Sequence, residues 1–268
     1  MNLFQYITAE FAAIQADSPE AEAKLVIESL YGNDFFQKVS GVDLSKFKNV
    51  LERRKKHEPI QYILGKAFFF NSEFIVTPDV LIPRPETEIM VEKLIEFIPE
   101  NGVMADIGCG SGCIGISVAL ERPDIRVYAF DISKNALAVA KQNAQMLHAD
   151  NVCFFESDLL SGCPDEVKFN AVGANLPYIP EVDYIQCQSE VKDYEPQLAL
   201  TTGDNGLEII IRCIGELPFF MLPGAKAFFE IDSSQTARMM QMLSGNGWIL
   251  PEIIKDYTGR ERFVVGTR

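Results

Sequence analysis

Four consecutive residues, Asn175, Leu176, Pro177 and Tyr178, combine groups that could act together on a weakly nucleophilic nitrogen. They follow the mostly apolar segment 169–174, so we expect the asparagine at the end of a buried strand. An amide-type nitrogen is a poor nucleophile because its lone pair is delocalised. The side-chain oxygen of Asn175 and the main-chain oxygen of Leu176 can accept its two N–H hydrogens, which would aim the nitrogen at an electrophile.

The neighbours of Asn175 suit this task. The ring of Tyr178 can stack on a flat target group, with its face near developing positive charge. Pro177 biases Leu176 towards an extended backbone, and the chemistry uses the leucine's carbonyl rather than its side chain. The alternative is that Asn175 only caps a turn. A glycine-rich loop earlier in the chain favours the catalytic interpretation.

That loop lies within the segment 105–115, ADIGCGSGCIG, between an expected strand and an expected helix. Its glycines are Gly108, Gly110, Gly112 and Gly115. Glycines permit tight turning and a close approach of the backbone to a nucleotide-containing cofactor. Asp131 ends the next expected strand, where its carboxylate can accept hydrogen bonds from both ribose hydroxyls. These features alone are also compatible with a nicotinamide or a flavin cofactor.

Composition limits the classes of protein that the chain could represent. Its 268 residues are 47% hydrophobic, which is enough for one large domain or for a medium and a small one. A net charge of −14 argues against binding nucleic acid through phosphates and favours a small molecule or a basic protein partner. Six cysteines without a CxxC pair, and only two histidines, indicate reduced thiols and no metal site. Short apolar runs and an acidic amino-terminal segment indicate a cytoplasmic protein without membrane spans.

The elements that must position these residues fall into two parts. Helical spacing of apolar residues, continued over about 45–56, predicts an N-terminal helical domain at residues 1–65. Two apolar runs flank Asn71 and Ser72 and predict a β-hairpin, which fills residues 66–85 together with a proline-rich linker.

Residues 86–268 alternate between strand and helix patterns, which is typical of a parallel sheet with helices on both faces. The expected strands are 103–108, 126–132, 152–158, 169–176, 226–231 and 262–267. In such an α/β sheet the ligand site lies beyond the carboxyl ends of the strands.

Three features narrow the choice of cofactor. Asp106 precedes the glycines as D-I-G-C-G-S-G, a pattern that resembles S-adenosylmethionine-dependent methyltransferases. Asp158 and Leu159 end the third expected strand, where such enzymes hold the adenine. The Asn-x-Pro-Tyr segment after the fourth strand has no use in a dehydrogenase.

Further segments extend this resemblance over nearly the full length of the chain. They are PIQYILG (59–65), VLIPRPETE (80–88), NLPYIP (175–180), YEPQLALTTGDNGL (194–207) and KDYTGRERFVVG (255–266). The chain resembles the HemK/PrmC-type peptide chain release factor glutamine methyltransferases. The resemblance implies a class I, Rossmann-like methyltransferase sheet and a helical N-terminal domain for protein recognition. It also implies methylation of the glutamine side-chain nitrogen in the Gly-Gly-Gln motif of release factors, which supports translation termination.

The resemblance also implies site residues. Contacts with S-adenosylmethionine, converted to S-adenosylhomocysteine, would fall on Gly108, Cys109, Gly110, Ser111, Gly112, Asp131, Asp158, Leu159 and Asn175. The target glutamine would contact Asn175, Leu176, Pro177 and Tyr178, of which Asn175 and Tyr178 would serve catalysis. Two positions depart from the family pattern: Leu176 replaces a proline, which affects turn rigidity, and Asp232 stands where glycine is common.

Three alternatives remain open. A glutamine methyltransferase acting on a ribosomal protein would share every catalytic residue. An amino-methyltransferase of DNA or RNA would also act on a weakly nucleophilic nitrogen. Such an enzyme usually needs a flipped base and a basic channel, which the net charge of −14 disfavours. A cofactor-binding interaction protein, disabled by Leu176, would be no enzyme. We expect a monomer that acts on release factors, without direct contact to nucleic acid or membranes.

Overall fold

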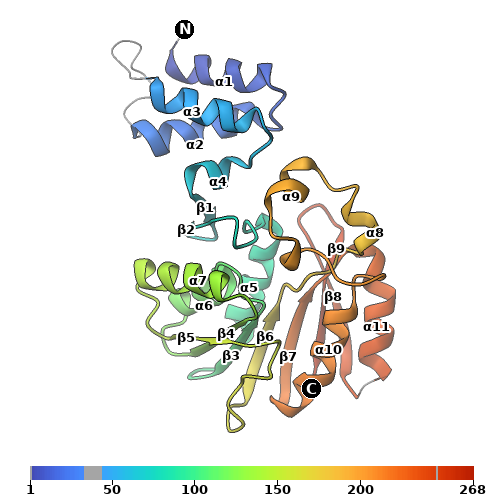
Figure 1. Cartoon of the computed structure of the whole chain (residues 1–268). Coiled ribbons are helices and arrows are strands. Elements are labelled where there is room, and N and C mark those ends of the chain that lie inside the picture. The colour runs from blue at the N-terminus through green and yellow to red at the C-terminus, as the bar shows by residue number, and fades with distance from the viewer. Residues whose placement is uncertain (1, 33–43, 246) are drawn as a thin grey trace. The chain divides into compact units, whose positions relative to one another are not determined.

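The computed structural model describes residues 2–32, 44–245 and 247–268 (Figure 1). The chain divides into two compact units, and each is described by itself. The smaller unit comprises Met1–Lys66 and Ser189–Tyr194, and the larger unit comprises Ala67–Gln188 and Glu195–Arg268. In the described part of the chain, no helix is both long enough and apolar enough to cross a lipid bilayer.

The smaller unit is helical, as the apolar spacing predicted. Its helices are α1 (Leu3–Ala13), α2 (Pro19–Tyr31), α3 (Ser45–Arg54), α4 (Ile60–Leu64) and α9 (Ser189–Tyr194). Asn2 begins α1 with a reciprocal pair of hydrogen bonds to Gln5, which satisfies amide groups that the first turn leaves open. Ile7, Phe11 and Phe47 are fully buried where the first three helices pack together. The short helices α4 and α9 were not expected from the sequence.

A buried arginine ties the distant segment α9 to this unit. The Nε of Arg54 lies 2.8 Å from Oε2 of Glu22 on α2, and its Nη2 lies 2.6 Å from Oε1 of Glu190 on α9. The hydroxyl of Tyr194 donates to the carbonyl of Lys56 at 2.7 Å. Because α9 buries none of its own residues, charged and polar contacts hold it to the helices.

The hairpin forms as predicted. Strands β1 (Lys66–Phe69) and β2 (Ser72–Ile75) pair as a two-stranded sheet, and Phe70 and Asn71 lie between them. Phe69 and Phe74 are fully buried and meet edge to face with ring centroids 6.1 Å apart. The turn therefore starts one residue earlier than the Asn71-Ser72 pair that predicted it.

The larger unit is built on a seven-stranded sheet with the order β5-β4-β3-β6-β7-β9-β8. Its strands are β3 (Val103–Ile107), β4 (Arg126–Asp131), β5 (Val152–Glu156), β6 (Phe169–Ala174), β7 (Met221–Glu230), β8 (Ile249–Lys255) and β9 (Glu261–Thr267). The six expected strands are present, and β8 was missed. The predicted parallel pairing is present from β3 to β7. It was wrong at β9, which runs antiparallel to both of its neighbours. The short link between β8 and β9 makes them a hairpin, and a hairpin requires antiparallel pairing.

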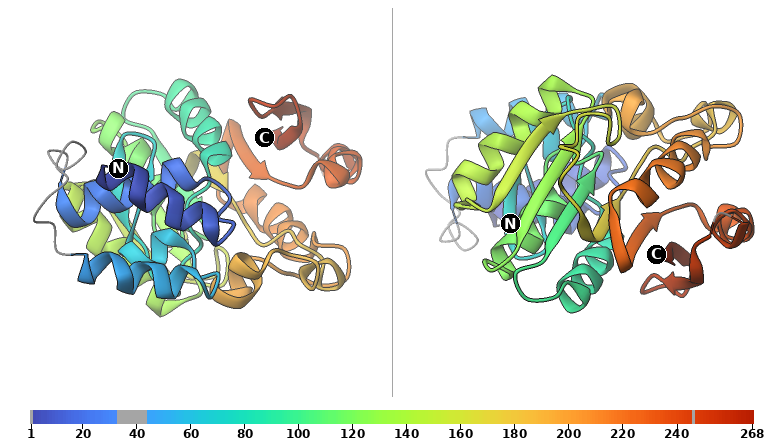
Figure 2. Two further views of the ribbon diagram at one scale, coloured as in Figure 1. Left: turned by 90° about the horizontal axis from the view of Figure 1, so that it is seen from above. Right: turned by 90° about the horizontal axis from the view of Figure 1, so that it is seen from below.

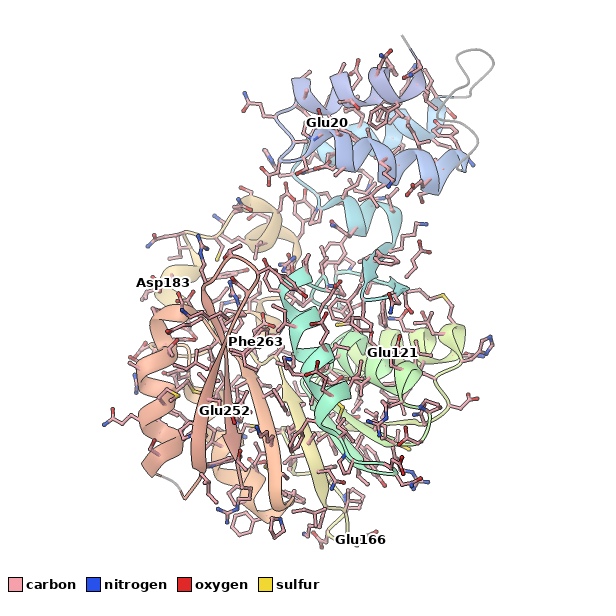
Figure 3. All side chains as sticks on the ribbon, turned by 180° about the vertical axis from the view of Figure 1, so that it is seen from behind. Glu20, Glu121, Glu166, Asp183, Glu252 and Phe263 are labelled. Carbon is pink, nitrogen blue, oxygen red and sulfur yellow. The ribbon has the colours of Figure 1, made fainter. Side chains whose placement is uncertain are left out.

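Helices cover both faces of this sheet (Figure 2). They are α5 (Glu88–Phe97), α6 (Cys113–Glu121), α7 (Lys134–Leu147), α10 (Glu208–Glu216) and α11 (Thr236–Gly245). Successive strand residues point to opposite faces, so each strand contributes to two cores. Phe229 packs in the core that contains residues of α10 and α11, whereas Phe228 and Phe263 (Figure 3) pack in the core that contains residues of α5, α6 and α7.

The register of the strands aligns their carboxyl ends. Ile107 of β3 pairs with Phe130 of β4 and with Ala174 of β6, and Ala174 pairs with Phe229 of β7. The residues that follow these four in the chain are Gly108, Asp131, Asn175 and Glu230. They therefore lie along one edge of the sheet, where parallel α/β sheets bind ligands.

Candidate active site

The glycine-rich loop after β3 has the backbone that its sequence requires. Gly108, Gly110 and Gly112 have φ angles of +72°, +54° and +80°, in the left-handed region that favours glycine. A Cβ atom on Gly110 would meet no atom within 4 Å, so this part of the loop lies open to a ligand. The loop leads directly into α6.

Asp131, at the end of β4, holds the loop in place. Its Oδ2 accepts a hydrogen bond from the amide of Gly110 at 2.8 Å, and its Oδ1 accepts one from the amide of Ser133 at 2.9 Å. The amide of Ile132 also interacts with this carboxylate, so backbone amides fix its orientation, and its remaining acceptor capacity is open to a ligand. Burial raises the pKa of the Asp131 carboxyl above its usual value.

Asp106 binds the first turn of α6, the helix that follows the glycine-rich loop. It is fully buried in β3, and its Oδ2 accepts a hydrogen bond from the amide of Gly115 on α6 at 2.8 Å. Its Oδ1 has no hydrogen-bond partner among the described residues. Burial raises the pKa of this carboxyl to about 7. A Cβ atom on Gly115 would stand 2.8 Å from Asp106 Oδ2, which explains the fourth glycine of the motif.

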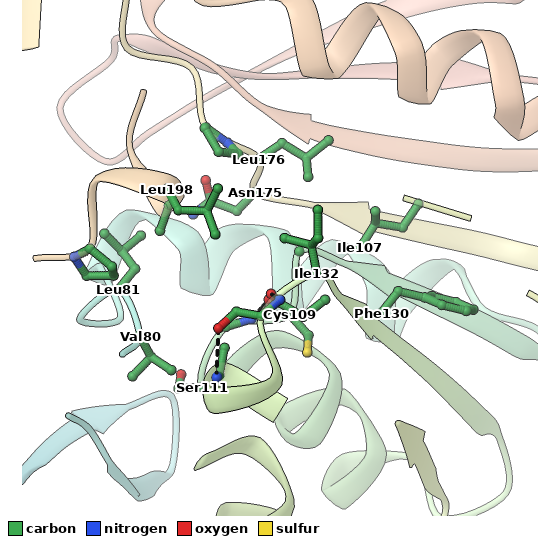
Figure 4. A pocket seen from close by; sticks show the side chains of 18 of the residues that line it. Val80, Leu81, Ile107, Cys109, Ser111, Phe130, Ile132, Asn175, Leu176 and Leu198 are labelled. Atoms are coloured by element: carbon green, nitrogen blue, oxygen red, sulfur yellow. Dashed lines mark hydrogen bonds between the residues drawn. The ribbon is translucent and has the colours of Figure 1, made fainter. Parts of the chain in front are cut away.

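A pocket of about 330 Å³ lies at this edge (Figure 4), a volume typical of small-molecule sites. Ten of the predicted residues line it: Gly108, Cys109, Gly110, Ser111, Asp131, Asp158, Leu159, Asn175, Leu176 and Pro177. Gly112 and Tyr178 are not among the lining residues. Residues between the hairpin and α5 also line the pocket: Pro78, Asp79, Val80, Leu81, Pro83, Arg84 and Thr87. The sequence indicated a linker up to residue 85 and a family segment at 80–88, but it assigned none of these residues to the site.

The predicted adenine contacts lie after β5. Leu159 is buried, whereas Asp158 is about half exposed. Asp158 Oδ2 lies 2.7 Å from Nη2 of Arg212 on α10, which also lines the pocket. One oxygen of Asp158 is thus engaged in an ion pair that the sequence did not reveal.

Asn175 follows β6, and its side chain makes a long hydrogen bond. The Nδ2 group donates to Oγ1 of Thr87 at 3.4 Å, and within the described residues this is the one hydrogen bond of the Asn175 side chain. Thr87 ends the short 3₁₀ helix η2 (Pro85–Thr87) and is buried. The Thr87 hydroxyl in turn donates to Oε2 of Glu230 at 2.7 Å. Burial raises the pKa of the Glu230 carboxyl to about 7.

Tyr178 is held by its main chain. Its carbonyl accepts a hydrogen bond from Nε2 of Gln235 at 2.8 Å, and the next residue, Ile179, forms a parallel bridge with Thr201. Burial and the nearby Glu230 carboxylate raise the pKa of the Tyr178 hydroxyl, so the phenol stays protonated. The structure therefore fixes the segment after Asn175 but does not bring Tyr178 into the lining of the pocket.

Asp232, the second departure from the family pattern, is the N-cap residue of the 3₁₀ helix η5 (Ser233–Gln235). Its Oδ1 accepts hydrogen bonds from the amide and the hydroxyl of Ser234 at 2.9 and 2.6 Å. Its own amide donates to Oε1 of Gln235 at 3.1 Å, which completes a capping box. Asp232 thus positions Gln235, whose side chain binds the Tyr178 carbonyl.

The sequence reasoning missed Thr87, Glu230 and Arg212 as residues at or beside the pocket. Thr87 lies within the recognised segment 80–88, but its role could not be read from its neighbours in the chain. Glu230 carried the clearest available signal, because it is an acidic residue at the carboxyl end of a strongly apolar strand.

The sheet, the glycine loop and the strand-end acid together define a Rossmann-like methyltransferase. Residues 85–186 match the family model "Methyltransferase small domain", and residues 2–65 match "PrmC N-terminal domain". A methyltransferase structure from Pyrococcus furiosus superimposes with a TM-score of 0.56 at 16% identity, over 74% of this chain and 89% of that one. This likeness supports the fold.

Relatives of known name then specify the family. The release factor glutamine methyltransferase of Geobacter sulfurreducens is 35% identical, over 88% of this chain and 82% of the relative. That of Leptospira interrogans is 40% identical, over 89% of this chain and 85% of the relative. The chain belongs to the release factor glutamine methyltransferase family.

Proposed function

We propose that this chain transfers the methyl group of S-adenosylmethionine to the side-chain amide nitrogen of the glutamine in the Gly-Gly-Gln motif of peptide chain release factors. The observation that carries the proposal is the position of Asn175, which lines the same pocket as the glycine loop and Asp131. The names of the relatives support the choice of substrate. Because termination of translation is cytoplasmic, we place the enzyme in the cytoplasm and propose that it acts as a monomer.

The residues of the pocket fit the proposed cofactor. Backbone amides hold the Asp131 carboxylate in a fixed orientation, and its remaining acceptor capacity suits the hydroxyls of a ribose. The open backbone at Gly110 admits the amino-acid part of the cofactor. Leu159 supplies an apolar wall for the adenine, and Asp158 a hydrogen-bond acceptor beside it. When bound, S-adenosylmethionine supplies a methyl group activated by its sulfonium.

The chemistry that remains for the protein is to present the glutamine nitrogen. Asn175 Oδ1 and the carbonyl of Leu176 accept its two N–H hydrogens, which aims the lone pair at the methyl group and favours its localisation. These acceptors also stabilise the positive charge that develops on the nitrogen as the new C–N bond forms. Tyr178 would have to approach the target group from outside the pocket lining, so we assign it a substrate contact rather than a cofactor contact.

The helical part of the chain would recognise the protein substrate. We propose residues 1–65 as the recognition domain, residues 66–85 as its connection and residues 86–268 as the catalytic domain. A glutamine side chain offers little binding energy by itself, so remote contacts must contribute to its orientation. An intact release factor can make such contacts, whereas a short peptide cannot.

The test compares substrates at equal concentration. The purified chain is incubated with labelled S-adenosylmethionine and either an intact release factor or a short peptide that contains its Gly-Gly-Gln loop, and the label is located by peptide mass spectrometry. We expect methylation of the Gly-Gly-Gln glutamine, with a much higher kcat/KM for the intact factor. A release factor with alanine at that glutamine is the matched control. Label on a ribosomal protein or a nucleic acid, or equal kcat/KM for both substrates, would contradict the proposal.

A further inference from the structure

The proposed reaction depends on which end of the Asn175 carboxamide faces the target nitrogen. The oxygen accepts an N–H hydrogen, whereas the NH₂ group is a donor and would repel it. The two ends have almost the same shape, so packing alone selects poorly between them. Hydrogen bonding to a fixed partner must set the orientation.

Thr87 and Glu230 provide such a partner. The Thr87 hydroxyl lies 2.7 Å from Glu230 Oε2 and 3.4 Å from Asn175 Nδ2. An ionised carboxylate can only accept, so the single proton of the Thr87 hydroxyl must point to Glu230. The Thr87 oxygen then has only lone pairs left for Asn175 and must accept from its NH₂ group. The oxygen of the Asn175 carboxamide is left to face the substrate.

The fold brings these residues together from three separate elements. Asn175 and Glu230 follow the paired residues Ala174 and Phe229 on the adjacent strands β6 and β7. Thr87 is the last residue of η2, directly before α5, and it is 143 residues from Glu230 in sequence. Thr87 and Glu230 are each 2% exposed, so water competes little for either bond. A buried carboxylate is costly unless it is hydrogen-bonded, and the Thr87 hydroxyl supplies such a bond to Glu230.

We infer that Thr87 and Glu230 form a positioning relay that fixes the carboxamide of Asn175 with its oxygen towards the target nitrogen. The inference rests on the proposed function, because it assigns positioning residues for that reaction. Neither residue needs to touch the substrate. Both act through Asn175.

The relay has a direction only while Glu230 is ionised. A protonated Glu230 can donate to the Thr87 oxygen, which frees the Thr87 proton to donate to a reversed Asn175 carboxamide. The groups that set this ionisation come from several elements. Burial and Glu86 oppose the charged form, whereas the hydrogen bond from Thr87, Arg262 on β9 and Arg84 before η2 favour it. Tyr178 after β6 and the thiol of Cys113 on α6 also interact with the Glu230 charge.

The first test replaces the hydroxyl of the relay. Thr87→Val keeps the shape of the side chain and removes the hydroxyl, whereas Thr87→Ser keeps the hydroxyl and is the matched control. Single-turnover methyl transfer to an intact release factor and calorimetric binding of S-adenosylmethionine are measured for each. We expect kcat to fall by about tenfold in Thr87→Val and to stay within about threefold in Thr87→Ser, with KM and cofactor affinity unchanged in both. A fall of less than about threefold in Thr87→Val would overturn the inference.

The second test does not depend on the folding of Thr87→Val. The single-turnover rate of the wild type is followed over roughly pH 5.5 to 8.5 beside Glu230→Gln, whose side chain does not titrate. We expect the wild-type rate to fall as Glu230 becomes protonated at low pH, and this fall to be absent in Glu230→Gln. The same low-pH fall in both proteins would overturn the relay. If the wild type itself does not methylate the release factor, it is the proposed function that fails.

Discussion

Leu176 fills the space directly beside Gly108: a Cβ atom on Gly108 would stand 2.9 Å from the Cδ2 atom of Leu176. The leucine is 4% exposed and belongs to the core that contains residues of β6, β7 and α10. The residue after Asn175 is therefore held by packing, where the family pattern has the rigid ring of a proline. This contact places the segment after β6 against the glycine-rich loop after β3.

This packing predicts separate effects on stability and catalysis in Leu176→Pro. The carbonyl that we propose accepts the substrate N–H is retained, so methyl transfer should stay within about tenfold of the wild type, or about 1.4 kcal/mol. Loss of buried methyl groups should lower the free energy of unfolding by about 1–3 kcal/mol, and Leu176→Ala should lower it further. Urea unfolding and single-turnover assays measure the two effects. A folded but inactive Leu176→Pro would show that the leucine side chain itself is needed for the reaction.

The same contact predicts a difference between two glycines of the loop. Gly108 and Gly110 both have positive φ, so an alanine at either position costs about 1–2 kcal/mol in backbone strain. Only Gly108→Ala adds a collision with Leu176, whereas the position at Gly110 is open. We expect a clearly lower melting temperature for Gly108→Ala than for Gly110→Ala. Both should weaken binding of S-adenosylmethionine. Equal melting temperatures would contradict this prediction, because they would mean that the Leu176 side chain moves aside without a loss of stability.

The buried ion cluster of the smaller unit predicts a local loss of stability. Arg54→Met leaves the buried Glu22 without its cation, which costs about 3–5 kcal/mol for a buried pair. Hydrogen exchange over residues 2–31 should become much faster, whereas binding of S-adenosylmethionine should not change. Lys55→Met removes an exposed pair with Glu52 and should change exchange little. Unaltered protection in Arg54→Met would contradict a structural role for this cluster.

Two buried carboxyls predict how stability depends on pH. Burial raises the pKa values of Asp106 and Glu230 to about 7, above their usual values near 4. Between these values the native state binds more protons than the unfolded state, so the free energy of unfolding should fall as pH rises towards 7. Glu230→Gln should remove its share of this dependence and be more stable than the wild type above pH ~7. Denaturant unfolding across this range would contradict the account if stability rose with pH and Glu230→Gln followed the same curve.

Local patterns in the sequence predicted the parts of the site that depend on neighbours in the chain. The glycine loop, Asp131 and Asn175 each stand at a strand end, and the structure places all of them around one pocket. Strand β8 was missed because Pro251 and Glu252 interrupt its apolar pattern, and its pairing with β9 is irregular. The prediction of parallel pairing failed at β9 because the direction of this strand is set by the short link that joins it to β8. The apolar pattern of a strand does not encode its direction.

Contacts between distant segments could not be predicted in this way. Thr87 meets Glu230 across 143 residues of sequence, and Glu190 joins the helical unit through Arg54. The prolines of residues 78–85 predicted a linker, yet several residues of this segment line the pocket. Tyr178 matches the family motif, but it is not among the residues that line the pocket. Resemblance to the family, rather than residue spacing, supplied the release factor as substrate.

The central claim is that Asn175 presents the glutamine nitrogen and takes little part in holding the cofactor. Its most direct test is single-turnover methyl transfer to an intact release factor by the wild type and by Asn175→Ala, with the affinity for S-adenosylmethionine measured by calorimetry on the same samples. The account predicts a rate lower by about two orders of magnitude in Asn175→Ala, as for the loss of an aligned polar group, with nearly unchanged cofactor affinity. Equal rates of methyl transfer in the two proteins would contradict it.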